Sequence, residues 1–81
     1  MMQKSIGSRA YAHFLDCLRE TRETAGLTQA DLAARLRLSQ SFISKCERGE
    51  RRVDIVELRQ FCTAMGETLD NFIECFERKL R

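Results

Sequence analysis

The sequence predicts an all-α protein, a compact bundle of five helices that forms a single domain over residues 1–81. The chain contains no Pro and four Gly among its 81 residues, so few residues interrupt helices or build the turns of a β-sandwich. With 43% hydrophobic and 32% charged residues, the composition is typical of a folded, soluble chain. Apolar residues recur at helical spacing in successive segments, and a chain of this length has room for one core.

The first helix is expected to end at Gly26, a residue type that readily adopts the left-handed conformation found after helices. Its apolar residues follow one another mostly at intervals of three, four and seven, as on one face of an amphipathic helix. They are Tyr11, Phe14, Leu15, Leu18 and Ala25. Ser8 is the candidate N-cap.

A capping residue that follows an apolar residue marks the start of each of the next three helices. The apolar residue can pack on another one five positions later, as in a hydrophobic staple. The caps are Thr28, Ser39 and Asp54, and the staple pairs are Leu27 with Leu32, Leu38 with Ile43, and Val53 with Leu58. Acids three residues after two of the caps, Asp31 and Glu57, complete capping boxes. These signals predict helices at about 29–36, 40–47 and 55–65.

The connection between the helices at 29–36 and 40–47 is only three residues long. Two short helices joined so closely cross at about 90–120°, which is helix-turn-helix geometry. We expect the small side chain of Ala33 where the two helices cross, and Ile43 pointing inward. The opposite face of helix 40–47 is then left to solvent.

The last two helices supply the remaining apolar surface. Helix 55–65, stopped by Gly66, is expected to bury Ile55, Leu58, Phe61, Cys62 and Met65. Thr68 can cap a helix at about 69–80 with a strong apolar stripe. Four residues of this stripe are the candidates for a homodimer interface, and the alternative is that all four complete the monomer core. They are Phe72, Ile73, Phe76 and Leu80.

Charge and cysteine spacing limit the classes of function. The net charge is +2, but residues 35–52 hold six basic and two acidic residues, which suits a surface that faces phosphates or a solvated charged surface. The four cysteines form no C-x-x-C pair and are read as buried thiols, with redox sensing as the alternative. They are Cys17, Cys46, Cys62 and Cys75.

Other sequence features predict no metal site, cofactor or small-molecule ligand. His13 is the only histidine, and no catalytic constellation is recognisable, so an enzyme is not expected. No apolar run is long enough to cross a bilayer, and the first ten residues lack the apolar region of a signal peptide. A cytoplasmic protein is therefore expected.

Residues 28–52 read TQADLAARLRLSQSFISKCERGERR. This segment resembles the helix-turn-helix of the lambda-repressor and Cro-like regulators, also called the xenobiotic-response-element type. The likeness includes the Gly26 to Gln29 entry, Ala33, Ile43, and Glu47 with Gly49. It implies a protein that binds double-stranded DNA and inserts helix 40–47 into the major groove. The segment departs from the family pattern at Arg37, where a Gly is common.

The resemblance also implies roles for individual residues. The base-reading candidates are Gln40, Ser41, Ser44 and Lys45, whose side chains can hydrogen-bond base edges. The phosphate-contacting candidates are Thr28, Gln29, Arg48, Arg51 and Arg52, with Arg9, Arg37 and Lys45 as helpers. Gln29 is also expected to brace Gln40, and Arg22 to form a buried ion pair with Glu47. The ring of Phe42 faces either the core or a thymine methyl group.

In function, the resemblance implies a sequence-specific transcriptional regulator, a homodimeric repressor on a palindromic operator. Alternatives with the same fold are a controller protein of a restriction-modification system or an antitoxin that docks a toxin on its last helix. A protein-interaction module that has lost DNA binding is a further alternative. Its expected mark is an acidic or apolar face on helix 40–47, and residues 40–52 show neither.

Overall fold

The computed structural model describes the backbone of residues 2–81 and the side chains of residues 9–81. Within this range the chain forms five helices and no strand. The helices are α1 (Met2–Thr24), α2 (Gln29–Leu36), α3 (Gln40–Glu47), α4 (Ile55–Met65) and α5 (Leu69–Leu80). The all-α, five-helix prediction is therefore confirmed.

Side-chain caps determine where α2 to α5 begin. The Thr28 hydroxyl accepts a hydrogen bond from the Asp31 backbone N–H at 3.0 Å, and the Asp31 carboxylate accepts one from the Thr28 N–H at 3.0 Å. Asp54 and Glu57 form the same reciprocal box at the start of α4. Ser39 and Thr68 cap α3 and α5 through their hydroxyls. The expected bounds of these four helices are confirmed. Each cap stabilises the start of its helix, because it satisfies N–H groups that lack partners in the first turn.

Two local expectations are wrong. Ser8 does not cap α1, which begins at Met2 and includes Ser8 in its interior; the residues before it continue the helix, so no cap is needed there. Ile55 is 58% exposed instead of buried. It lies in the first turn of α4 and lines an open cavity that α1 and α5 border, and the buried stripe starts at Leu58.

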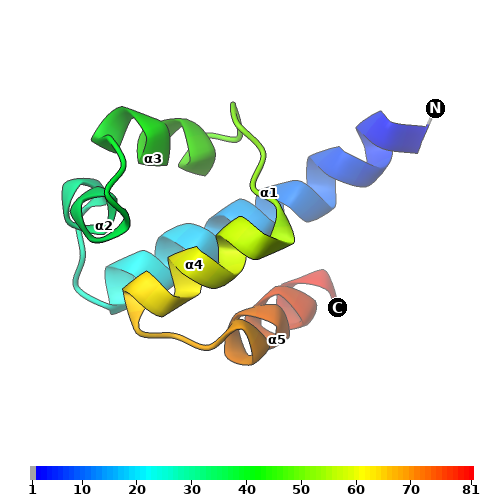
Figure 1. The fold of residues 1–81 in the computed structure, drawn as a ribbon. Coiled ribbons are helices and arrows are strands. Elements are labelled where there is room, and N and C mark those ends of the chain that lie inside the picture. Colours follow the sequence, from blue (N-terminus) through cyan, green and yellow to red (C-terminus); the bar gives the residue numbers. More distant parts are fainter. Residues whose placement is uncertain (1) are drawn as a thin grey trace.

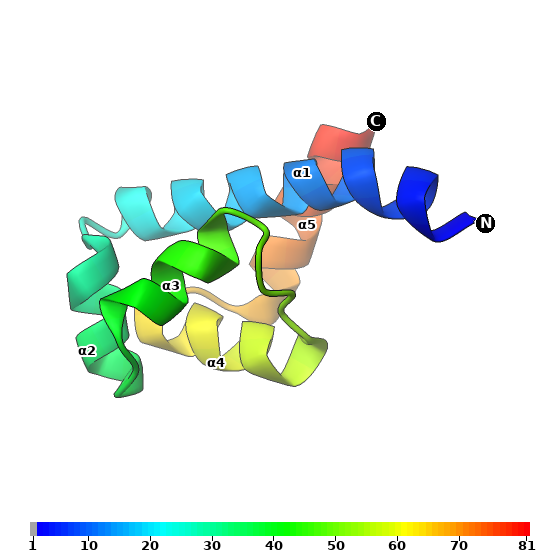
Figure 2. The same ribbon diagram turned by 90° about the horizontal axis from the view of Figure 1, so that it is seen from above.

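Helix α4 separates the pair α2 and α3 from α5. Figures 1 and 2 show α2 and α3 crossing at one end of the molecule, and Figure 1 shows α5 across α4 from α3. Helix α1 contacts both α3 and α5, and α4 contacts both α2 and α5. Consequently α1 and α4 form the platform that holds α3 on one side and α5 on the other.

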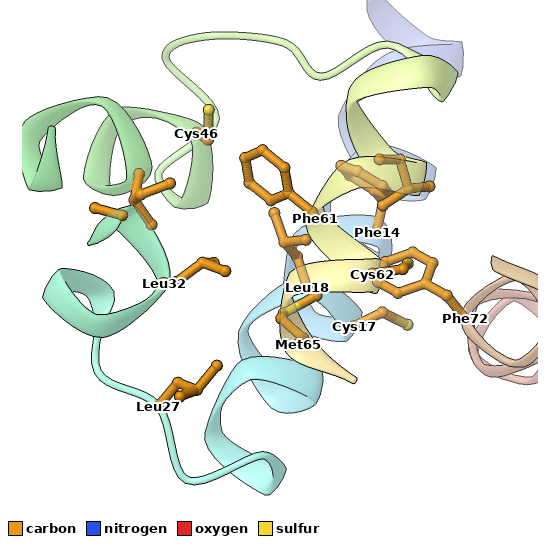
Figure 3. Packing of buried hydrophobic residues seen from close by; sticks show 13 residues of the cluster. Phe14, Cys17, Leu18, Leu27, Leu32, Cys46, Phe61, Cys62, Met65 and Phe72 are labelled. Atoms are coloured by element: carbon orange, nitrogen blue, oxygen red, sulfur yellow. The ribbon is translucent and has the colours of Figure 1, made fainter. Parts of the chain in front are cut away.

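The core lies between these layers and draws side chains from all five helices (Figure 3). Residues 1% exposed or less include Leu18 of α1, Leu32 of α2, Ile43 of α3, Cys62 of α4 and Phe72 of α5. The rings of Phe14 and Phe72 meet edge to face, with centroids 5.7 Å apart. Burial of this kind, at about 25 cal/mol per Å² of apolar surface, is the main source of stability for such a small domain.

The turn between α2 and α3 contains a left-handed residue. Arg37 has φ 59° and ψ 41°, a conformation that costs a non-glycine residue about 1 kcal/mol or more. The N–H of Leu38 donates to the Ala33 carbonyl at 2.9 Å. Leu38 itself is 41% exposed, so the staple expected with Ile43 is at most partial. The helix-turn-helix geometry therefore requires Arg37 to adopt a strained left-handed conformation.

Candidate nucleic-acid interface

The outward face of α3 carries the base-reading candidates. Ile43 and Cys46 are fully buried and anchor the inner face of the helix. Gln40, Ser41 and Lys45 are exposed on the outer face, and Ser44 is half-buried beside them. Figure 1 shows α3 on the outer side of the molecule, away from α5. The helix therefore presents short polar groups and one cation to solvent, with its orientation set by the buried side.

Arg48 ties the end of this face to the loop after α3. Its guanidinium donates to the Ser44 hydroxyl, and to both Glu50 carboxylate oxygens at 2.9 and 3.2 Å. The hydrogen bonds from Arg48 lower the pKa of the Glu50 carboxyl. Arg48 is thus already paired with an acid on the surface. Gln40, Ser41 and Lys45 are exposed, and Lys45 acts on Glu50 only through its charge.

A buried ion pair joins α1 to the end of α3. The Arg22 guanidinium donates to the two Glu47 carboxylate oxygens at 2.6 and 3.0 Å, and to the Leu27 carbonyl at 2.8 Å. Arg22 is 8% exposed, and the hydrogen bonds with Glu47 raise its pKa. The Arg22 side chain therefore joins α1 both to the last turn of α3 and to the residue that precedes the α2 cap.

Gln29 joins the same network. Its side-chain amide donates to Glu47 at 3.0 Å, so the bond it makes runs to the end of α3 and not to Gln40, the partner expected from the sequence. The buried carboxylate of Glu47 accepts three hydrogen bonds, which compensates for the removal of its charge from water. Gln29 thus positions α3 through Glu47.

Arg51 anchors the loop between α3 and α4. It donates to both Glu57 carboxylate oxygens at 2.6 and 2.7 Å and to the Arg52 carbonyl at 2.8 Å. Chiefly through these bonds, Arg51 lowers the pKa of Glu57 to about 2. The guanidinium also lies 4.8 Å from the centre of the Phe42 ring, and that ring packs half-buried against the core. Phe42 therefore faces inward, and Arg51 is engaged in holding the loop.

Arg52 is more open than Arg51. It is exposed, with its guanidinium 4.4 Å from the centre of the Tyr11 ring. The Tyr11 hydroxyl accepts a hydrogen bond from the Val53 N–H at 3.1 Å. Contact with an aromatic face leaves the N–H groups of a guanidinium available to other acceptors. Arg52 is thus a better phosphate-contacting candidate than Arg51.

The other phosphate-contacting candidates lie on different elements. Thr28, at the start of α2, is exposed and uses its hydroxyl as the cap. Arg37, in the turn, and Arg9, on α1, are exposed as well.

The loop contacts of Tyr11 and Glu57 were missed by sequence reasoning, because they join residues whose spacing follows no helical period.

In the described part of the chain, no group of three or more His, Cys, Asp or Glu side chains could hold a metal ion. No helix there combines the length and apolar character required to cross a membrane.

Comparisons with known proteins agree with this geometry. A family model described as a helix-turn-helix domain matches residues 13–71. The solved structure of an XRE-family like protein from Pseudomonas syringae pv. tomato str. DC3000 is 41% identical and superposes with a TM-score of 0.86, covering 96% of this chain and 95% of that chain. No curated protein matches. The chain belongs to the helix-turn-helix family of the XRE type and is a DNA-binding regulator.

Proposed function

We propose that this protein is a sequence-specific repressor that binds a palindromic operator as a homodimer, with α3 in the major groove. The observation that carries the proposal is the outward face of α3, where Gln40, Ser41 and Lys45 are exposed while Ile43 is fully buried. A rigid helix with polar groups on its free face suits base reading, because the groove admits an α-helix and each base pair displays its own donor and acceptor pattern there.

Each exposed side chain of α3 has a base it can recognise. Gln40 can bond adenine through two hydrogen bonds, Lys45 can donate to guanine, and Ser41 can donate or accept. The hydroxyl of Ser44 accepts a bond from Arg48 and keeps its own proton to donate. These four residues are the proposed base-reading set.

Contacts with phosphates would position the helix. The N-terminus of α2, with Thr28 and Gln29, attracts phosphate through its unpaired N–H groups and its dipole. Arg52 and Arg48 flank α3 from the loop that follows it. Arg51 acts differently, through its bonds to Glu57, and holds the loop that carries Arg52. Such contacts set affinity and salt dependence without reading sequence.

The proposed dimer surface consists of Ile55, Ile73 and Leu80, which are 58%, 37% and 43% exposed. Ile55 and Ile73 line one mostly apolar cavity of about 350 Å³ between α1, α4 and α5, with Phe76 also in its wall. Phe72, a candidate from the sequence, is 1% exposed, because its ring packs inward on Phe14. It therefore belongs to the core. To bind a palindromic operator, two copies joined here must hold their α3 helices at half-sites about 34–36 Å apart.

The function is tested by selecting bound duplexes from a random pool, followed by a salt series on the enriched site. We expect one palindromic site, and a log–log salt slope that reports the number of phosphates contacted. Wild-type protein that enriches no sequence would overturn the proposed sequence-specific function.

The dimer is tested by sedimentation of the protein at micromolar concentration, with and without the selected duplex. Ile73→Asp should weaken self-association at least about tenfold, because it places a charge on apolar surface that must be desolvated. Leu38→Asp is the matched control in the measurement without DNA, since Leu38 is similarly exposed, at 41%, but lies in the turn between α2 and α3. Wild-type protein that stays a 9.4 kDa monomer without DNA and binds the duplex as a single copy contradicts the dimer. That result favours the antitoxin alternative, in which a different protein covers α5.

A further inference from the structure

Two thiols from distant parts of the sequence meet where α1 packs on α5. The sulfur atoms of Cys17 and Cys75 lie 3.1 Å apart, although the residues are 58 positions apart in the chain. A disulfide bond is about 2.05 Å long, so the two sulfur atoms need only a small approach to bond. Figure 3 shows Cys17 on the side of the core toward Phe72 and α5, whereas Cys46 lies by α3.

The two thiols differ in access to solvent. Cys17 is fully buried, and burial is the main reason that its pKa is raised to about 12. Cys75 is only half-buried and lines an open cavity of about 480 Å³ between α1, the α4–α5 connection and α5. Lys79, whose ammonium lies 3.0 Å from the Glu20 carboxylate, exerts its charge on both sulfur atoms. A small oxidant can therefore reach Cys75 directly and Cys17 only through Cys75.

We propose that Cys17 and Cys75 form an oxidative modification site, at which a hydroperoxide converts the two thiols into an intramolecular disulfide between α1 and α5. The Cys75 thiolate attacks one oxygen of the hydroperoxide, the O–O bond breaks, and water or an alcohol leaves with the thiol's proton. The Cys17 sulfur then attacks the sulfenic acid on Cys75. The S–S bond forms, the S–O bond breaks, and hydroxide takes the Cys17 proton as water, so two thiols reduce one hydroperoxide.

The disulfide would clamp α5 to α1 without touching α3. A link between positions 17 and 75 closes most of the chain into a loop and restricts the unfolded state, which stabilises the fold. The α3 face lies on the other side of α4 and would keep its geometry. Oxidation thus locks the helix that carries Ile73 and Leu80 and leaves the helix that carries Gln40 and Lys45 unchanged.

The experiment oxidises the reduced full-length protein with one equivalent of hydrogen peroxide and measures its intact mass, its thiols after denaturation, and its melting temperature. We expect a monomer that has lost two hydrogen atoms and two alkylatable thiols, with a single Cys17–Cys75 cross-linked peptide. The melting temperature should rise on the order of 10 °C, and dithiothreitol should reverse every change.

Two variants separate this site from general thiol oxidation. Cys75→Ser should keep its fold, because the position is half-buried, and should form no intramolecular disulfide. Cys62→Ala is the matched control, since Cys62 is a buried thiol outside the proposed pair, and it should still lose two hydrogen atoms. An unchanged mass, a covalent dimer, a sulfinic acid at Cys75 or a cross-link to Cys46 or Cys62 would each overturn the proposal.

Discussion

The two helices on opposite sides of α4 expose surfaces of opposite chemistry. Helix α3 buries Ile43 and Cys46 completely and shows polar groups to solvent, whereas α5 buries Phe72 and leaves Ile73 and Leu80 exposed at 37% and 43%. The α3 side is further held by the ion pair of Arg22 with Glu47. The fold thus separates a polar surface, which suits contact with a nucleic acid, from an apolar one, which suits contact with a protein.

The largest effect is expected from breaking the ion pair that holds the α3 side. Arg22→Ala should lower the free energy of unfolding by about 3 to 5 kcal/mol, because it leaves the buried carboxylate of Glu47 without its cation. A urea titration followed by circular dichroism measures this loss.

Arg19→Ala is the control for this change. Arg19 also belongs to α1, and its ion pair with Asp16 is exposed, with side chains 45% and 44% accessible. Its loss should cost less than about 1 kcal/mol. Equal effects of the two substitutions would show that burial does not decide the strength of the Arg22 pair.

The next largest effect is expected on base discrimination, from the exposed side chains of α3. Lys45→Ala and Gln40→Ala should each cost about 1 to 3 kcal/mol of discrimination at one base position of the selected operator. Competition binding with single-base variants of that operator measures it. Arg78→Ala removes a cation from α5, on the side away from α3, and should change neither affinity nor discrimination. A uniform loss for all duplexes in Lys45→Ala would move Lys45 to the phosphate-contacting set.

A smaller effect concerns the strained turn that orients α3. Arg37→Gly should stabilise the protein by up to about 1 kcal/mol, because Gly adopts the left-handed conformation without a Cβ clash, less the entropy it adds to the unfolded chain. Ala34→Gly, in the exposed interior of α2, should instead destabilise it by about 0.5 to 1 kcal/mol. Denaturant midpoints of the two variants compare them, and a loss of stability in both would contradict the strain at Arg37.

The smallest effect is a pH dependence in the loop after α3. The pKa of Glu57 is lowered from 4.5 to about 2 in the folded protein, so its ionised form stabilises the fold fully above pH 4.5 and progressively less as the pH falls toward 2. Wild type and Glu57→Gln should differ most in melting temperature near neutral pH and converge toward pH 2. Arg51→Ala should behave alike, since it removes the partner. A difference that stays constant with pH would contradict this role of the pair.

Sequence reasoning succeeded where a local signal exists. The caps Thr28, Ser39 and Asp54 and the left-handed Gly66 determine helix ends within a few residues of themselves, and the family resemblance identified the partner of Arg22. It failed where burial depends on distant elements. Ile55 has the spacing of a core residue but lines an open cavity between α1, α4 and α5. The Gln29 amide reaches Glu47, 18 residues away.

The five helices, the polar outer face of α3 and the family follow from the sequence, because caps, periodicity and motif residues act over short distances along the chain. Which exposed groups remain available depends on the tertiary structure. It engaged Arg51 with Glu57, buried Phe72, left Ile73 exposed and brought Cys17 to Cys75. Pairings of this kind depend on how helices cross in space, and no periodicity in the chain encodes the distance between two side chains on different helices.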